Sequence, residues 1–115
     1  MANTVITPID ITEGSLSTIA TLASSTAIVA ANTHSIAFPK QGRLEIEVQN
    51  TYAGDKVVTV AAGDKIGAKA ETLKLAQNAV ATIYPDSSKH KDANGNVVIT
   101  VASGTTGTIR AKRLV

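Results

Sequence analysis

The chain has 115 residues, a mass of 11.8 kDa, a formal net charge of +2 and no cysteine. This length suits a single domain whose core needs no metal or disulfide, and the lack of cysteine excludes disulfides, thiolate zinc sites and a cysteine nucleophile. Aromatic residues make up 3% of the chain and the charge imbalance is small, which excludes the basic, aromatic surface of a typical nucleic-acid-binding protein. The most apolar stretch, residues 16–31, is short and rich in Ser and Thr, so no transmembrane helix is predicted.

The first 22 residues differ from the remainder of the chain. Residues 5–11 alternate like an extended segment, but Pro8 removes a backbone donor, which favours an edge strand or an arm. Residues 13–23 have apolar spacing that suits one or two helical turns, with Thr12 as N-cap. Two interpretations stay open: an arm that docks on a neighbouring molecule, or an edge strand and connector on the domain's own surface.

The arm hypothesis divides the chain into an arm or connector, residues 1–22, and a domain, residues 23–115. It assigns partner binding to the apolar residues of the extended segment, which are Val5, Ile6, Pro8, Ile9 and Ile11.

The rest of the chain consists of short β-branched segments separated by turn signals about every ten residues. The clearest is 43–49, where apolar residues alternate with charged or polar ones, as in an antiparallel strand with one solvated face. Ile66 is expected to fold back onto the core, and Leu73 and Leu75 are expected to face inward. The predicted strands are 26–31, 34–38, 43–49, 56–61, 71–75, 79–84, 97–101 and 108–113.

About eight short strands are too many for one open sheet in a chain of this length. We therefore predict an all-β fold, a two-sheet antiparallel β-sandwich with jelly-roll-like or related Greek-key connections and an N-terminal arm.

The polar stretch 86–96 holds the only grouping that resembles a catalytic triad: Ser87 or Ser88, His90, and Asp86 or Asp92. A triad needs a base held by a third group and a separate oxyanion hole, and the sequence contains no G-x-S-x-G nucleophile elbow. We therefore interpret this stretch as a solvated loop and predict no catalytic residues and no enzymatic activity.

Metal and cofactor motifs fail in the same way. Residues 92–96 resemble the start of a calcium loop, but the twelfth position holds Ser103 where an EF-hand needs Glu, so a turn at Asn94-Gly95 is expected. His34 and His90 have no ligand-spaced partners. Neither a metal nor a cofactor is predicted.

Two small basic clusters, residues 89–91 and residues 110–113, are interpreted as solvated faces. A contact with an acidic protein surface is the alternative for them.

Three stretches resemble the small structural proteins of tailed bacteriophages. Phe38–Thr51 contains a Gly-Arg before a hydrophobic strand that ends in Asn-Thr, and Lys56–Gly63 is similar to that family's Thr-Val-Thr-Val strand and Ala-Gly turn. Ala102–Leu114 is similar to the Gly-Thr-Thr-Gly-Thr-Val-Arg-Ala ending of these proteins. The resemblance covers about two thirds of the chain and leaves out the first 22 residues and the loop 86–96.

The resemblance implies a head decoration or capsid auxiliary protein with a β-sandwich fold. Such a protein binds the outer capsid lattice, so the implied partner is the major capsid protein, the implied assembly is a homo-oligomer, with a trimer favoured, and the implied location is the virion after synthesis in the host cytoplasm. A protein of the phage tail or its fibres is the alternative. A cellular carbohydrate- or protein-binding module is less favoured, because carbohydrate sites rely on aromatic platforms and the chain has three aromatic residues.

Overall fold

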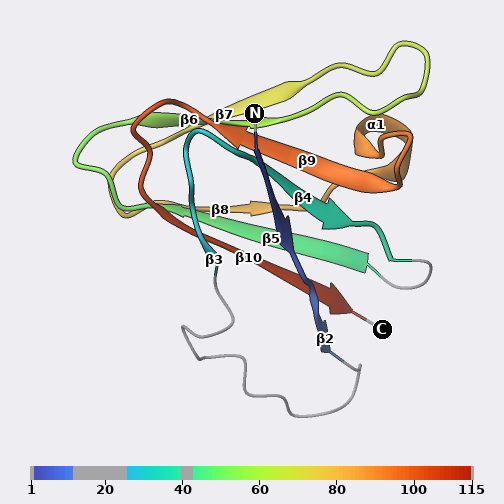
Figure 1. Ribbon diagram of the computed structural model, residues 1–115, viewed down its shortest axis with the longest axis horizontal. Coiled ribbons are helices and arrows are strands. Elements are labelled where there is room, and N and C mark those ends of the chain that lie inside the picture. Colours follow the sequence, from blue (N-terminus) through green and yellow to red (C-terminus); the bar gives the residue numbers. More distant parts are fainter. Residues whose placement is uncertain (1, 12–25, 40–42, 115) are drawn as a thin grey trace.

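The computed structural model describes residues 2–11, 26–39 and 43–114. In these residues the chain forms two sheets that pack face to face as a β-sandwich (Figure 1). The first sheet has five strands, in the order β1 (Asn3–Ile6), β4 (Thr33–Ala37), β9 (Asn96–Val101), β6 (Lys56–Val60) and β7 (Glu71–Leu75). The second has β2 (Ile9–Ile11), β10 (Gly107–Leu114), β5 (Arg43–Asn50) and β8 (Val80–Ile83), and the two-residue β3 (Thr26–Ala27) also pairs with β10.

The prediction of an all-β sandwich is confirmed, and the described residues form nine strands of three or more residues in place of about eight. Neighbouring strands are antiparallel except at the N-terminus, where β1 joins β4 and β2 joins β10 in parallel. One α-helix, α1 (Ser87–His90), interrupts the polar stretch that the sequence predicts as a loop.

The core lies between the two sheets and comes from the period-two pattern of the strands. In β5, Leu44, Ile46 and Val48 are buried while the charged residues between them face outward, as the alternation predicts. Each such side chain contributes roughly 1.5–3 kcal/mol when it is fully buried. The remaining buried apolar residues are Ile6, Ile36, Val58, Val60, Leu75, Ala81, Val97, Ile99, Ile109 and Ala111.

Two local predictions differ from the structure. The strand expected at 26–31 has only two residues, because the chain turns where Asn32 donates its backbone N–H to the Val29 carbonyl at 2.9 Å. Ile66 is fully exposed and does not fold back onto the core. Its loop is held at Gly63 and Asp64 by backbone bonds to the segment around α1, which directs the loop tip outward.

Leu73 faces the same side as the buried Val58, as predicted, yet it stays about half exposed because β7 is an edge strand. The helical turns expected within 13–23, the Thr12 cap and the turn at 40–42 lie outside the described residues.

Candidate functional site

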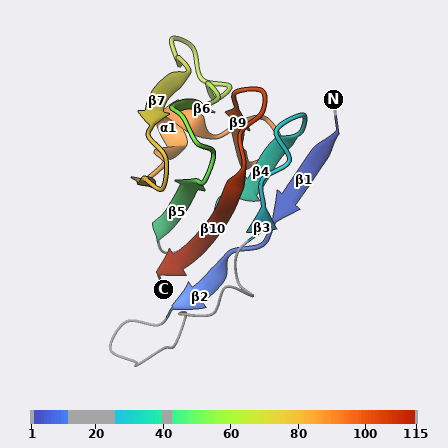
Figure 2. The ribbon, with the colours of Figure 1, turned by 90° about the vertical axis from the view of Figure 1, so that its left-hand side faces the viewer.

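The N-terminal strands β1 and β2 form consecutive segments along one side of the sandwich (Figure 2). Each lies at or beside the edge of a different sheet, since β1 pairs with β4 and β2 with β10. Short polar side chains reinforce β1: Asn3 donates to the Ser35 hydroxyl at 2.9 Å and accepts from the Thr33 hydroxyl at 2.8 Å, and Asn32 donates to the Thr4 hydroxyl at 3.1 Å. In the described chain, β1 and β2 pair with strands of their own domain.

The structure does not place the five predicted partner-binding residues on one common face. Ile6 is 2% exposed and belongs to the core, whereas Val5 is 71% exposed and points away from it. Pro8 and Ile9 are half-buried where the chain passes from one sheet to the other. Ile11 pairs through its backbone with Leu114, and its side chain lies outside the described part of the chain.

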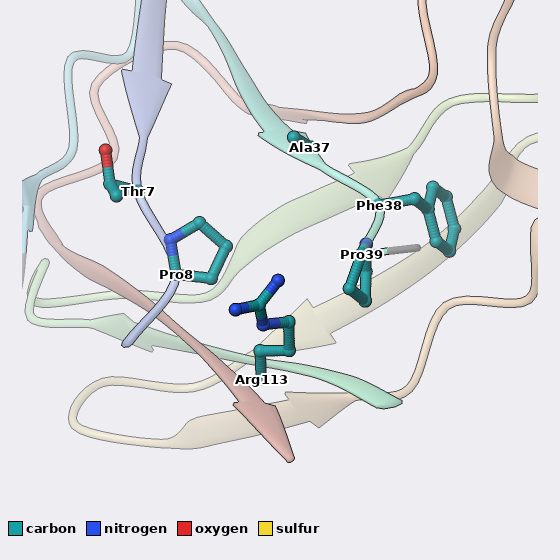
Figure 3. Close-up of a pocket in the computed structure, with 6 residues that line it drawn as sticks. All are labelled: Thr7, Pro8, Ala37, Phe38, Pro39 and Arg113. Atoms are coloured by element: carbon teal, nitrogen blue, oxygen red, sulfur yellow. The ribbon is translucent and has the colours of Figure 1, made fainter. Parts of the chain in front are cut away.

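A shallow hollow of about 330 Å³ lies beside Pro8, at the junction of β1 and β2 (Figure 3). Its walls are mostly apolar, and the guanidinium of Arg113 lies between the rings of Pro8 and Pro39. The ring of Phe38 is directed away from that guanidinium. The hollow therefore combines apolar surface with a cationic group, and Pro8 is the predicted partner-binding residue that lines it.

The triad-like residues have a different arrangement from a catalytic triad. Asp86 caps α1, accepting from the Ser88 amide at 2.7 Å and the Ser88 hydroxyl at 2.6 Å, and these bonds lower the pKa of the Asp86 carboxyl. His90 is buried; its Nδ1 accepts from the Asp86 N–H at 3.0 Å, so Nε2 carries the proton that it donates to Glu71 at 3.0 Å. Both ring nitrogens are thus engaged with groups other than serine, and His90 ties α1 to the edge strand β7.

The calcium-like stretch is a turn, as predicted. The carboxylate of Asp92 accepts from the backbone amides of Asn94 at 2.8 Å and Asn96 at 3.0 Å, and Gly95 has a positive φ of 80°. Throughout residues 2–11, 26–39 and 43–114, no group of three or more His, Cys, Asp or Glu side chains could hold a metal ion.

His34 is fully buried against the core and bonded only to backbone groups. Its Nε2 accepts from the Val29 N–H at 3.2 Å, and its Nδ1 donates to the Ile99 carbonyl at 3.3 Å. Burial lowers the pKa of His34, against the smaller opposing effect of the bond to Ile99, so the ring is held neutral. This histidine is a structural group that links β4 and β9 to the turn before β4.

The basic cluster at 110–113 is neutralised in part by its own sheet. Arg110 lies 2.8 Å from Glu47, and Lys112 contacts both Glu45 and Glu47 across the β5–β10 ladder. The bond from Lys112 lowers the pKa of Glu47, and Glu47 in turn raises the pKa of Lys112. The outer face of the second sheet is therefore a paired charge ladder, which makes the contact with an acidic partner less favourable there.

Asn50 is a buried polar residue whose role sequence reasoning missed. Its amide donates to the carbonyls of Gly54 and Leu75, both at 3.0 Å, and its side-chain oxygen accepts from the Tyr52 N–H at 2.9 Å. It therefore fixes the loop between β5 and β6 to the end of β7. The only signal in the sequence is an Asn at the end of a strong strand pattern, which also suits an ordinary turn residue.

Comparison of the chain with protein-family models, with curated proteins and with solved structures finds no match. Among the described residues, no helix is long and apolar enough to span a membrane.

Proposed function

We propose that this chain is a non-enzymatic structural protein of a virion, which decorates the outer surface of a capsid and stabilises the head by bridging capsomers. The proposal starts from the resemblance of residues 38–51, 56–63 and 102–114 to phage structural proteins. These stretches contain β5, β6 and β10, so the resemblance concerns strands at the centre of both sheets.

The observation that carries the proposal is the resemblance of these three stretches, which lie on strands of both sheets. The large exposed apolar side chains lie on several strands and loops. Apolar residues scattered singly are normal on a protein surface, so they add nothing to the proposal. The residues concerned are Val5, Val29, Tyr52, Val57, Ile66, Leu73, Val80 and Tyr84.

Such a protein stabilises a capsid through linkage. If it binds the assembled lattice and not the separate subunits, it lowers the free energy of the lattice by about 2.7 kcal/mol per site when its free concentration is 100 times Kd. A chain that contacts two capsomers adds an effective-concentration term, since both contacts must break before it dissociates.

Within this proposal, the N-terminal contact with the capsid is made by the face that carries Val5 and by the junction around Pro8 and Ile9. Ile6 is not available to a partner while β1 is paired with β4, because its side chain fills the core.

Cryo-electron microscopy of tailed particles that lack this chain, incubated with the purified chain, tests the location. Density for the sandwich on the outer face of heads is the expected result. Density confined to tails would favour the tail protein over the decoration protein, and a failure to bind either would overturn the virion assignment.

A single substitution tests the N-terminal contact more sharply than a deletion, because deleting the strand also removes Ile6 from the core. Val5→Asp is expected to lower binding to heads at least about tenfold while the fold is kept, since the side chain is 71% exposed. Thr72→Asp, at an exposed position on the edge strand β7 at the opposite end of the same sheet, is the control. Equal binding by the two variants would show that Val5 makes no contact with the capsid.

A further inference from the structure

Among the described residues, strand β8 is an edge strand that carries no charged residue to protect its edge. It ends the second sheet beyond β5, and residues 76–85 around it contain no charged side chain. The neighbouring edge strand β7 carries Glu71 and Lys74, which discourage pairing with another chain. Of the two edges on this side of the sandwich, β8 is the one open to strand addition.

The exposed groups of β8 lie on one face and alternate along the strand. Val80 is 51% exposed and Tyr84 is 57% exposed, with the exposed Thr82 midway between them. The Asn50 N–H donates to the Ala79 carbonyl at 3.2 Å, so Ala79, and every second residue after it, directs its backbone groups to β5. The backbone N–H and C=O groups of Val80 and Thr82 are therefore directed to the open edge.

We propose that β8 is a self-association edge, at which two copies of this chain pair antiparallel about a twofold axis through Thr82. In a twofold antiparallel pair that keeps the faces of the sheet continuous, Thr82 lies opposite Thr82 of the second copy, and Val80 lies opposite Tyr84 in both directions. This register uses the backbone groups that point outward and brings together the two large exposed apolar side chains of the strand, as an aromatic and β-branched cross-strand pair.

The charges around the strand are compatible with this register. The first charged residue beyond the uncharged run is Asp86, and it falls opposite Asn78 of the second copy, so no like charges meet. Tyr84 is already held in place, because its hydroxyl donates to Glu45 at 3.2 Å and the guanidinium of Arg43 lies 5.7 Å from the ring centre. The apolar contact therefore needs little ordering of the aromatic ring when the copies meet.

This inference goes beyond the proposed function and does not depend on it. A twofold contact joins two copies and does not close a trimer, so a threefold assembly needs a different surface. On a lattice, the β8 contact links neighbouring copies that are already held close together.

Cysteine cross-linking of the purified chain tests the proposal, because the natural sequence has no cysteine. In a hydrogen-bonded antiparallel pair the two Cα atoms at position 82 are roughly 5.5 Å apart, a distance that a disulfide can span. Thr82→Cys is expected to form disulfide-linked dimers under mild oxidation at least about tenfold faster than Thr72→Cys, an exposed site on β7. Val80→Cys is expected to be as slow as that control, because the register separates the two copies of residue 80 by roughly 14 Å. Equal rates for the Thr82 and Thr72 variants, or fastest cross-linking of the Val80 variant, would overturn the proposal.

A charge-pair experiment tests the same axis without a covalent bond. In sedimentation velocity at about 1 mM chain, Thr82→Lys and Thr82→Glu are each expected to stay at the 11.8 kDa mass of one chain, because like charges would face each other across the axis. A mixture of the two variants is expected to regain the dimer. Dimers in either variant alone, with circular dichroism confirming that it is folded, would contradict the twofold register.

Discussion

Truncation of Ile6 to alanine tests whether the N-terminal strand is part of this domain's own fold. Ile6 is 2% exposed and joins the core between the two sheets, although it lies five residues from the start of the chain. Removing the buried part of an isoleucine costs about 2–5 kcal/mol, because the lost transfer free energy adds to the cost of the cavity left behind.

This loss is a large share of the stability of a chain of this size. At roughly 0.05–0.15 kcal/mol per residue, 115 residues give a free energy of unfolding of about 6–17 kcal/mol. With an m-value of about 1.5 kcal/mol/M in urea, a loss of about 3 kcal/mol lowers the unfolding midpoint by about 2 M.

Urea unfolding followed by far-ultraviolet circular dichroism measures this midpoint. Val5→Ala on the same strand is the matched control, and its 71% exposed side chain predicts a change within about 0.5 kcal/mol. If Ile6→Ala also changed stability by less than about 0.5 kcal/mol, the strand would not be anchored in the core, and the arm interpretation would replace the edge-strand one.

Three further predictions concern charge and backbone geometry. Burial lowers the pKa of His34 below its ordinary value of 6.5, so below about pH 6.5 the unfolded chain binds more protons than the folded chain. The contribution of His34 to stability is therefore complete above pH 6.5 and is lost as the pH falls. The melting temperature should be lower at pH 5.0 than at pH 7.5, and this difference should be smaller in His34→Gln. Glu47→Gln should lower the free energy of unfolding by about 1 kcal/mol or less, because the ion pairs of Glu47 with Lys112 and Arg110 are partly exposed. The difference from wild type should shrink in about 1 M salt, which screens these charges. Gly107→Ala should lower the free energy of unfolding in urea by at least about 2 kcal/mol, because φ is 144° and a Cβ would fall on the Gln49 carbonyl. Gly95→Ala is the control: its φ is also positive, but a Cβ would meet open space, so the loss should be about 1 kcal/mol.

Local patterns predicted most of the sandwich because they describe one strand at a time. The alternation of 43–49 defines which residues of β5 are buried, and the Asn94-Gly95 pair locates the turn before β9. The boundaries of β7 were predicted without error, since apolar residues and turn signals limit it on both sides.

Features that depend on distant partners could not be predicted in this way. Ile66 has the hydropathy of a core residue, yet its loop is held by bonds from Gly63 and Asp64 to a segment more than 25 residues away. The same segment contains α1, whose His90 is held by a hydrogen bond to Glu71 of β7. Neither contact has a signal in the local sequence.

The N-terminal segment shows this limit most clearly, because Val5 and Ile6 are both apolar and only the pairing of β1 with β4 decides which one is buried. Release of the strand to a neighbour would remove Ile6 from the core, at a cost similar to that of truncating it, unless the neighbour offered an equivalent pocket. A second copy of this chain is such a neighbour, since an exchanged strand would meet the same surroundings. Ile6→Ala would lower stability in both cases. In the Thr82→Lys variant, which blocks pairing through β8, only exchange would make the unfolding midpoint rise with protein concentration. A midpoint that stays constant between about 5 and 500 µM would show that the strand is docked within its own chain.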